Sequence, residues 1–471
     1  HKIKAEDRKM KYGNNKYEDI KIAYIGGGSR GWAWGFMSDL AVCEDMCGTV
    51  YLYDIDLEAA KKNEKIGNGI KNIEGCKSQW KYKAVETEKE ALEGADFVVI
   101  SILPGTFDEM ESDVHTPEKY NIYQSVGDTA GPGGILRALR TIPMFEEIAE
   151  NIKKYCPDAW VINYTNPMTM CVKTLYKVFP EIKAFGCCHE VFGTQKLLVN
   201  ALEDIKGIKD VKREDIKVNV VGVNHFTWLT KAQYKDIDIF PVYREFAEKY
   251  KDNGFVKKSD ENWMNKYFSC SEKVKIDLFL RYGSIAAAGD RHLAEFCPGD
   301  WYLKDKETVE KWGFALTPVS WRKGDLEKRL ERSEKLYSGE EKFELKETGE
   351  EGVQQIRALL GLGDLVTNVN IPNYGQIPNL PIGAVVETNA CFRANSLNPV
   401  FAGNIPQAVY PLISRVCGEQ EQVVDCALNR DLDGVFNAFA ADPNMCISVS
   451  DARKLFDEMV DNTKEYLKMY F

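Results

Sequence analysis

The segment Gly186–Gln195, GCCHEVFGTQ, places two thiols, an imidazole and a carboxylate next to one another. It continues the run IKAFG, whose apolar and aromatic residues are typical of the end of a β-strand. A Cys thiolate and a neutral His imidazole both bind divalent transition metals. Cys188, joined by His225 of the later motif VNHFTW, therefore predicts a metal site whose open positions would take substrate oxygens. The alternative is a buried thiol that only packs and a histidine that only hydrogen-bonds within the core.

A glycine-rich motif, YIGGGSRGWAWG, follows the first strand-like run and precedes a helical one. Gly26 and Gly28 permit a tight turn and the close approach of a phosphate, and Ser29 offers a hydroxyl to a pyrophosphate. Asp54 ends the next strand, where an acid binds the ribose of NAD and repels the 2′-phosphate of NADP. These residues predict an NAD site, and the alternative is that the glycines form only a loop.

Polar groups follow other strand-like runs as well. In NYTNP, Asn163 and Asn166 carry amides suited to sugar hydroxyls, although a plain Asn-Pro turn has the same pattern. In AAAGDRHLAEF, Asp290 follows a run of small residues and could reach a substrate; the alternative is a surface ion cluster. The stretch 124–143, QSVGDTAGPGGILRALRTIP, is dense in glycine and either wraps a ligand or only turns.

The elements that must position these residues alternate between strand-like and helix-like runs. Short apolar runs cover 21–26, 49–54, 95–102, 159–164 and 182–187, with helical stretches such as 139–154 and 167–178 between them. This alternation predicts βαβ units and a parallel sheet, which binds ligands at the carboxyl ends of its strands. The second half is less regular, with antiparallel strands expected over 217–234, a helix over 273–284, a charged helix or loop over 323–345 and an amphipathic helix over 451–470.

The predicted fold class is therefore α/β, a Rossmann-like doubly wound parallel sheet followed by a mixed α+β C-terminal catalytic domain. We expect a partly disordered N-terminal extension over 1–19, an NAD-binding domain over 20–198 and a substrate and metal domain over 199–471. No Pro/Gly-rich linker marks the boundary between the two domains.

The bulk composition excludes several classes of function. A net charge of −11 without a Lys/Arg block argues against nucleic-acid binding, which needs clustered positive charge. No stretch of 18 apolar residues predicts a membrane span, and the charged start has no signal-peptide core. Thirteen scattered cysteines without an export signal indicate free thiols in a reducing cytoplasm.

Taken together, the motifs resemble glycoside hydrolase family 4, the NAD-dependent, metal-requiring glycosidases. The resemblance extends over nearly the whole chain, through IGGGS, QSVGDTAGPGG, NYTNPM, CCHEV, VNH and NYGQIPNLPIGAVVE. It implies NAD and a divalent metal, usually manganese, as cofactors. It also implies a homodimer or homotetramer acting on a small sugar.

The resemblance assigns roles to particular residues. It places the metal ligands at Cys188 and His225, and a substrate-binding amide at Asn166 with Asn163 as a second candidate. Members that act on phosphorylated sugars carry Asn or Asp directly after the metal-binding Cys. His189 stands there in this chain, which implies an unphosphorylated sugar, and Glu190 completes a CHEV motif similar to that of the α-galacturonidase subgroup.

Other roles are less directly assigned. Phospho-sugar members use a Tyr base near AAAGDRH; this chain has Asp290 there, so Asp290 is the first candidate base and Tyr282 the second. His189 is expected to handle a proton or hydroxyl at the leaving group. A uronide carboxylate needs a cation, and Arg291 and Arg393 are candidates, each with an ordinary surface role as the alternative.

The implied reaction is hydrolysis of an α-galacturonide by hydride transfer from C3 to NAD, elimination, addition of water and return of the hydride. The same family also suggests an α-galactosidase, α-glucosidase or α-glucuronidase. Outside the family, the alternatives are an NAD-dependent sugar or hydroxyacid dehydrogenase and a non-catalytic NAD-binding sensor.

Overall fold

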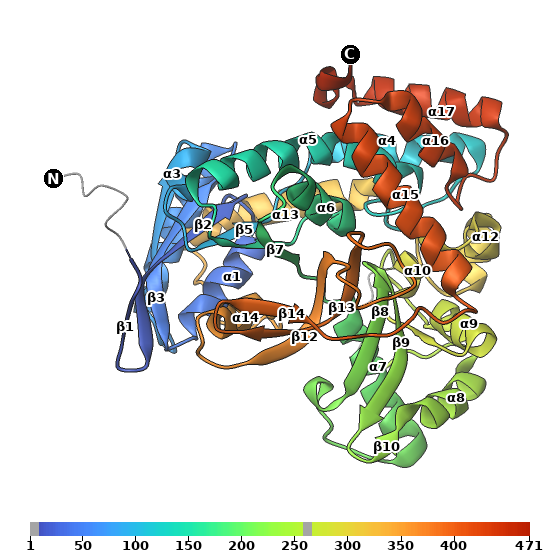
Figure 1. Ribbon diagram of the computed structural model, residues 1–471, viewed down its shortest axis with the longest axis horizontal. Helices are drawn as coiled ribbons and strands as arrows, with labels where there is room; N and C mark the ends of the chain where they lie inside the picture. The colour runs from blue at the N-terminus through green and yellow to red at the C-terminus, as the bar shows by residue number, and fades with distance from the viewer. Residues whose placement is uncertain (1–8, 258–265) are drawn as a thin grey trace.

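Ten strands of the chain form one large mixed sheet, which organises the whole molecule (Figure 1). The structure is a computed structural model that describes residues 9–257 and 266–471. The first eight residues of the predicted N-terminal extension lie outside the described residues. The rest of that extension contains β1 (Lys11–Gly13), which pairs antiparallel with β2 (Lys16–Ile25).

The parallel part of the large sheet has the strand order β4-β3-β2-β5-β6-β7. This order is that of a dinucleotide-binding fold, in which the chain reverses direction across the sheet beside the first strand. The predicted strands are confirmed as β2, β3 (Met46–Tyr53), β5 (Phe97–Ile100), β6 (Trp160–Asn163) and β7 (Lys183–Gly186). The strand β4 (Lys81–Val85), KYKAV, was not predicted, because its alternating lysines are typical of an exposed edge strand.

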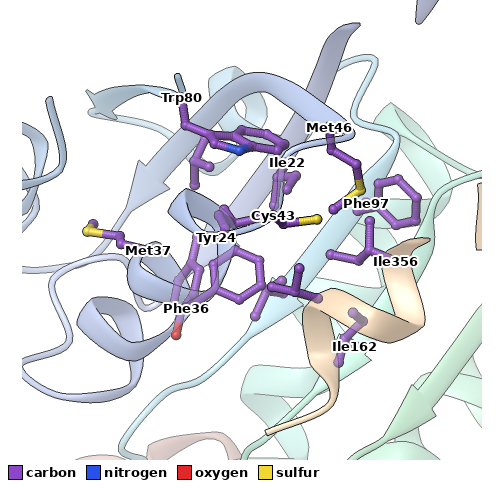
Figure 2. Packing of buried hydrophobic residues seen from close by; sticks show 14 of the residues in the cluster. Ile22, Tyr24, Phe36, Met37, Cys43, Met46, Trp80, Phe97, Ile162 and Ile356 are labelled. Atoms are coloured by element: carbon purple, nitrogen blue, oxygen red, sulfur yellow. The ribbon is translucent and has the colours of Figure 1, made fainter. Parts of the chain in front are cut away.

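Helices cover both faces of the parallel strands, as the apolar runs on those strands require. These helices are α1 (Trp32–Ala41), α2 (Leu57–Gly69), α3 (Glu88–Leu92), α5 (Gly131–Tyr155) and α6 (Met168–Val178). Because α5 begins at Gly131, only the first part of the glycine-dense stretch 124–143 is a loop. One apolar cluster joins β2, β5 and β6 to α1 and to α14 (Gly352–Leu359), and Figure 2 shows its side chains Ile22, Tyr24, Phe36, Met37, Phe97, Ile162 and Ile356.

The C-terminal half returns to the same sheet. Strands β12 (Leu365–Pro372), β13 (Val385–Arg393) and β14 (Ser396–Pro399) extend it antiparallel beyond β7. The contact between β12 and β7 pairs Asn370 with Gly186, directly before the CCHE motif. The predicted division into 20–198 and 199–471 remains a prediction, and both segments contribute strands to one sheet.

A second, smaller sheet is antiparallel, as predicted for 217–234. It contains β8 (Lys217–Val223), β9 (Phe226–Tyr234), β10 (Ile237–Asp238) and β11 (Ile285–Ala286). Asn224 and His225 form the turn between β8 and β9. The side chain of Asn389 on β13 donates to the carbonyl of Val218 at 2.7 Å, which anchors this hairpin against the large sheet.

The remaining helices surround the two sheets (Figure 1). The predicted helix over 273–284 is α9 (Lys273–Tyr282), the charged segment is α13 (Val319–Ser338), and the terminal helix is α17 (Val449–Asn462). Near the C-terminus, α15 (Tyr410–Leu428) and α16 (Leu432–Ala441) pack with α17 over α5. The other helices are α4 (Phe107–His115), α7 (Glu190–Lys206), α8 (Ile239–Tyr250), α10 (Asp290–Phe296), α11 (Gly299–Tyr302) and α12 (Lys306–Lys311).

Helix α13 bridges two helices that follow parallel strands. Lys323 forms an ion pair with Asp108 of α4 at 2.7 Å, and Glu334 forms one with Lys62 of α2. Because α2 and α4 begin after β3 and β5, α13 lies over the carboxyl edge of the sheet, where ligands bind in this fold.

Two further findings concern the chain as a whole. Among the described residues, no helix combines the length and the apolar character that crossing a bilayer requires. All thirteen cysteines lie within the described residues, and each is an unpaired thiol.

Candidate active site

The glycine loop after β2 is packed so tightly that side chains cannot be added to it. Gly26 has φ +97°, and a Cβ atom there would lie 1.8 Å from the carbonyl oxygen of Ser101. A Cβ atom on Gly28 would lie 2.7 Å from the Cβ of Ala59 on α2. The loop therefore keeps bare backbone at the amino end of α1, which is the arrangement that cradles a pyrophosphate.

Asp54 lies against this loop, as the spacing of the two motifs predicted. Its Oδ2 accepts a hydrogen bond from the Gly28 amide at 2.9 Å, and its Oδ1 accepts one from Asp56 at 2.9 Å. Burial raises the pKa of the Asp54 carboxyl. The Ser29 hydroxyl accepts from the amide of Ala33 at 3.4 Å in the first turn of α1. The roles of Ser29 and Asp54 toward a cofactor remain predictions.

His225 lies at the centre of a buried polar cluster. The turn between β8 and β9 gives it φ +64°, an uncommon conformation in which Asn, Asp and His are enriched. Its Nδ1 lies 3.1 Å from the hydroxyl of Thr129, and its ring stacks on His292 with 3.9 Å between ring centres. Ligand atoms of Asp128, His225 and His292 all lie within 4.8 Å of one another. Sequence reasoning did not assign Asp128 or His292, although both stand in motifs that it quoted.

The electrostatics of this cluster suit a cation. Burial, followed by the neighbouring His292, lowers the pKa of His225 to about 3, so the imidazole is neutral and can act as a ligand. Burial opposes ionisation of Asp128, but Arg137 and the two histidines outweigh it and lower the pKa of that carboxyl. An imidazole and a carboxylate are donors that manganese and similar ions accept.

Cys188 and Glu190 approach the same hairpin from the end of β7. The Cys188 thiol interacts with the side chain of Asn224, and burial raises its pKa well above the ordinary value. The Oε2 of Glu190 accepts from the amide of Gly289 at 2.9 Å, and its Oε1 lies 3.5 Å from Nε2 of His292. Burial would raise the pKa of Glu190, but His292 and His225 lower it to about 2. Glu190 is therefore an ionised group that orients His292.

His189 faces a different part of the site. Its Nδ1 lies 3.0 Å from the carboxylate of Glu350, a contact that raises the pKa of the imidazole. Its ring lies 6.3 Å from that of Trp32, whose ring is 5.2 Å from that of Tyr164. Trp32 is 42% exposed at the start of α1. A cavity of about 580 Å³ opens beside these residues, lined among others by Trp32, Trp34, Tyr164, Lys328 and Glu350.

The two asparagines of NYTNP have different surroundings. Asn163 is fully buried, and its amide is used within its own turn: Oδ1 accepts from Thr165, and Nδ2 donates to the Thr165 carbonyl. The amide of Asn163 is therefore already paired within its own turn, and its substrate role remains a prediction. Asn166 differs, since its buried Oδ1 accepts no hydrogen bond from any described residue. Its backbone carbonyl accepts from Arg137 at 2.9 Å, which leaves the side chain as an unpaired group at the strand end.

The two candidate cations for a uronide carboxylate also differ in their surroundings. Arg393 is a surface residue paired with Asp364 at 3.0 Å at the end of β13, and its role toward a uronide remains a prediction. Arg291 donates to Thr317 and to the Ser125 carbonyl, while its Nε is buried.

Arg322 on α13 also has a buried Nε, and neither this Nε nor that of Arg291 donates to any group in 9–257 or 266–471. Both guanidinium groups lie within electrostatic range of Asp128. Sequence reasoning missed Arg322, which stands in a charged helix without a distinctive motif.

The first candidate base, Asp290, lies in a group of its own. Asp290 is fully buried, and its carboxylate accepts from the amides of Val274 and Lys275 at the start of α9. Its oxygens group with Cys270 and Glu272 rather than with the histidines. The structure therefore gives Asp290 the position of a helix cap, and its role as a base remains a prediction.

Tyr282 lies at the end of α9, where its ring packs edge-on against Trp228 at 6.1 Å. The guanidinium of Arg281 lies over the same ring at 5.1 Å. These contacts involve the ring of Tyr282, and its role as the second candidate base remains a prediction.

One buried carboxylate near Cys188 was not anticipated. Glu387 on β13 accepts hydrogen bonds from the side-chain amides of Asn224, Asn368 and Asn370. Burial raises the pKa of its carboxyl, and the three amides act in the opposite direction. The signal in the sequence is the alternation in NVNIP, which puts two amides on one face of an otherwise apolar strand.

Two family models match most of this chain. The model of the family 4 glycosyl hydrolases matches residues 21–204, and the model of their C-terminal domain matches residues 220–445. An α-galacturonidase from Thermoanaerobacterium saccharolyticum is 66% identical over 97% of this chain and 98% of its own length.

Two solved structures have the same fold. The crystal structure of lplD from Bacillus subtilis superposes with a TM-score of 0.89 at 52% identity, covering 94% of this chain and all of that one. A 6-phospho-β-glucosidase from Thermotoga maritima, solved with manganese, NAD+ and glucose-6-phosphate, shares the fold at a TM-score of 0.74 and 21% identity over 95% of this chain and 99% of its own. The chain belongs to family 4 of the glycosyl hydrolases.

Proposed function

We propose that this family 4 enzyme is an α-galacturonidase that uses NAD and a divalent cation, with manganese as the first candidate. The observation that carries the proposal is the near full-length identity of 66% to an α-galacturonidase. Two arginines within electrostatic range of Asp128, Arg291 and Arg322, each keep a buried Nε–H without an acceptor among the described residues, and this supports the proposal because a uronide brings a carboxylate to the site.

The residues present fit both cofactors. The loop at Gly26 and Gly28 would hold the pyrophosphate of NAD, and Asp54 would bind its ribose. Cys188 and His225 would hold the cation, and the ligand atoms of Asp128 and His292 lie within 4.8 Å of that of His225. When bound, NAD supplies reversible hydride acceptance, and the cation supplies Lewis-acid polarisation of a sugar carbonyl.

We propose His292 as the base that removes the proton from the sugar, in place of Asp290. Its Nε2 faces the ionised Glu190, which fixes the orientation of the ring as a carboxylate does in other acid–base pairs. Its ring stacks on His225, so a sugar bound at the cation would lie beside it. Asn166 is proposed to bind a sugar hydroxyl through its unpaired amide oxygen.

Arg322 and Arg291 are proposed to bind the uronide carboxylate. Each has a buried Nε hydrogen without an acceptor among the described residues, and such a donor costs free energy until an acceptor arrives. The negative charge of the substrate would also relieve the repulsion between the two guanidinium groups.

The leaving group is proposed to occupy the cavity beside Trp32. The exposed face of this ring offers a stacking surface for a sugar. His189 lies next to it, and its contact with Glu350 keeps the imidazole protonated toward higher pH, as a proton donor at the glycosidic oxygen requires.

The test is a panel of p-nitrophenyl glycosides incubated with NAD, Mn²⁺ and a thiol. We expect release from the α-galacturonide and far slower release from the α-galactoside and the α-glucuronide. Clear release from either of the latter two, without release from the galacturonide, would refute the substrate. Accumulation of NADH in step with turnover would identify a dehydrogenase instead, because a glycosidase of this kind returns its hydride.

We further propose that the protein acts in the cytoplasm and self-associates as a dimer or tetramer. Thirteen unpaired thiols suit a reducing compartment. Exposed apolar side chains at Tyr374, Ile382 and Phe401 would be covered at an interface between copies. Light scattering of the purified chain would report the number of copies.

A further inference from the structure

Glu387 lies in a cage of asparagine amides. It is 1% exposed on β13. Its Oε1 accepts from Asn224 at 3.1 Å and from Asn370 at 3.2 Å, and its Oε2 accepts from Asn368 at 2.8 Å. Asn368 and Asn370 come from β12, and Asn224 comes from the turn between β8 and β9. The carboxylate thus ties the large sheet to the hairpin that carries His225.

The asparagines that hold Glu387 contact the segments of both proposed metal ligands, Cys188 and His225, although Glu387 is not itself proposed as a ligand. Asn224 directly precedes His225, so the position of its side chain constrains the turn that presents the imidazole. The same side chain interacts with the thiol of Cys188, and Asn368 donates to the Cys188 carbonyl at 3.4 Å.

Stability of the core does not by itself explain this arrangement of Glu387 and the three asparagines. A buried carboxylate costs free energy to desolvate, and apolar residues of the same volume are often as stable or more so. The cage also leaves two buried acceptors unused, because Oδ1 of Asn224 and Oδ1 of Asn370 receive no hydrogen bond within the described residues. Unused acceptors beside a thiol and an imidazole suit a site that receives a cation with its bound water.

We propose that Glu387 is a positioning residue for the divalent cation: by holding Asn224 and Asn368, it fixes Cys188 and His225 in place before the ion binds. The inference rests on the metal site of the proposed function. Groups that orient metal ligands in this way change metal affinity by about 10- to 100-fold when they are replaced. Glu387 and its asparagines would then act on metal binding rather than on the sugar.

The experiment measures Mn²⁺ affinity of the full chain with NAD present, from the free Mn²⁺ signal in electron paramagnetic resonance. Glu387→Gln keeps the size of the side chain but sets an NH₂ group against the asparagine NH₂ groups. We expect its Kd for Mn²⁺ to rise by about 10- to 100-fold. Glu419→Gln is the control, because it changes another carboxyl with a raised pKa, which is partly buried on α15. Melting temperatures in EDTA report the stability of each variant without metal.

An unchanged Mn²⁺ affinity in Glu387→Gln, with or without a lower melting temperature, overturns the inference. If that variant does not fold, Asn368→Ala decides, since it removes one donor to Glu387 and the contact to Cys188. Weaker Mn²⁺ binding by Asn368→Ala supports the inference, and unchanged binding overturns it. Failure of the wild-type chain to bind Mn²⁺ would instead refute the metal site of the proposed function, and the inference would fall with it.

Discussion

Arg322→Met is the substitution that most directly tests how the site selects an acidic sugar. Arg322 lies in the first turns of α13, and its Nε is buried without an acceptor among the described residues. Methionine keeps much of the apolar length of the side chain but removes the charge and every donor. Among the arginines, Arg137 lowers the pKa of the Asp128 carboxyl more than Arg322 does, so most of the compensation of this carboxylate remains in the variant.

The expected size of the effect follows from the hydrogen bonds lost. A hydrogen bond to a charged group contributes about 1.5–3 kcal/mol, and about 1.4 kcal/mol corresponds to a factor of ten. We therefore expect kcat/KM for an α-galacturonide to fall by about 10- to 100-fold. An α-galactoside has no carboxylate, so its kcat/KM should stay nearly constant, and the ratio of the two should fall by the whole factor.

The assay compares both p-nitrophenyl glycosides at saturating NAD and Mn²⁺. Arg393→Met is the matched control, because that arginine is exposed and paired with Asp364 on the surface. Equal losses for the two glycosides would show that Arg322 supports the structure of the site instead of selecting the carboxylate. No loss for the galacturonide would remove Arg322 from the site altogether.

Four other substitutions test separate parts of the reasoning. Cys188→Ser should weaken Mn²⁺ binding by at least about tenfold, measured by calorimetry, and an unchanged affinity would dismiss the thiol as a ligand. His292→Asn should lower kcat by about 10²- to 10⁴-fold and slow the exchange of the sugar C2 hydrogen with solvent, while NAD binding stays constant; full exchange would exclude His292 as the base. Trp32→Ala should reduce kcat/KM by about 2- to 10-fold for a galacturonide disaccharide but not for the aryl glycoside, and a weaker Kd for NAD would place the ring at the cofactor instead. Burial raises the pKa of Glu419 and of its partner Asp442, so their contribution to stability is present below the unfolded pKa near 4 and is lost as the pH rises through the folded values. Glu419→Gln should therefore flatten the fall of the melting temperature above about pH 5. A profile of melting temperature against pH identical to that of the wild type would contradict this reasoning.

Local pattern was enough to predict much of the fold. Strands β2, β3, β5, β6 and β7 are apolar runs that need burial on both faces, and such runs can be recognised without knowing their neighbours. The glycine loop is similar, because its spacing reports a backbone conformation that only glycine tolerates at Gly26. The contact between Gly28 and Asp54 follows from the parallel pairing of β2 and β3, which brings both strand ends together.

The chemistry of individual side chains depended on partners from distant segments. Asn163 and Asn166 stand three residues apart in one motif, yet only Asn166 keeps a free oxygen, because the turn bends Asn163 back onto Thr165. Asp290 has the composition of a base, but the packing of α9 against α10 supplies its carboxylate with two backbone amides.

By itself, the sequence determined the layered sheet, the position of the cofactor loop and the identity of the groups able to bind a metal, since these depend on residue type and local spacing. Only the tertiary structure decided which arginine has an unpaired donor, which histidine faces Glu190 and which carboxylate holds the asparagines around Cys188. The physical reason is that hydrogen-bond satisfaction and burial are properties of a whole neighbourhood. Here that neighbourhood is assembled where β12 and β13 return to β7 and where the β8–β9 hairpin meets them.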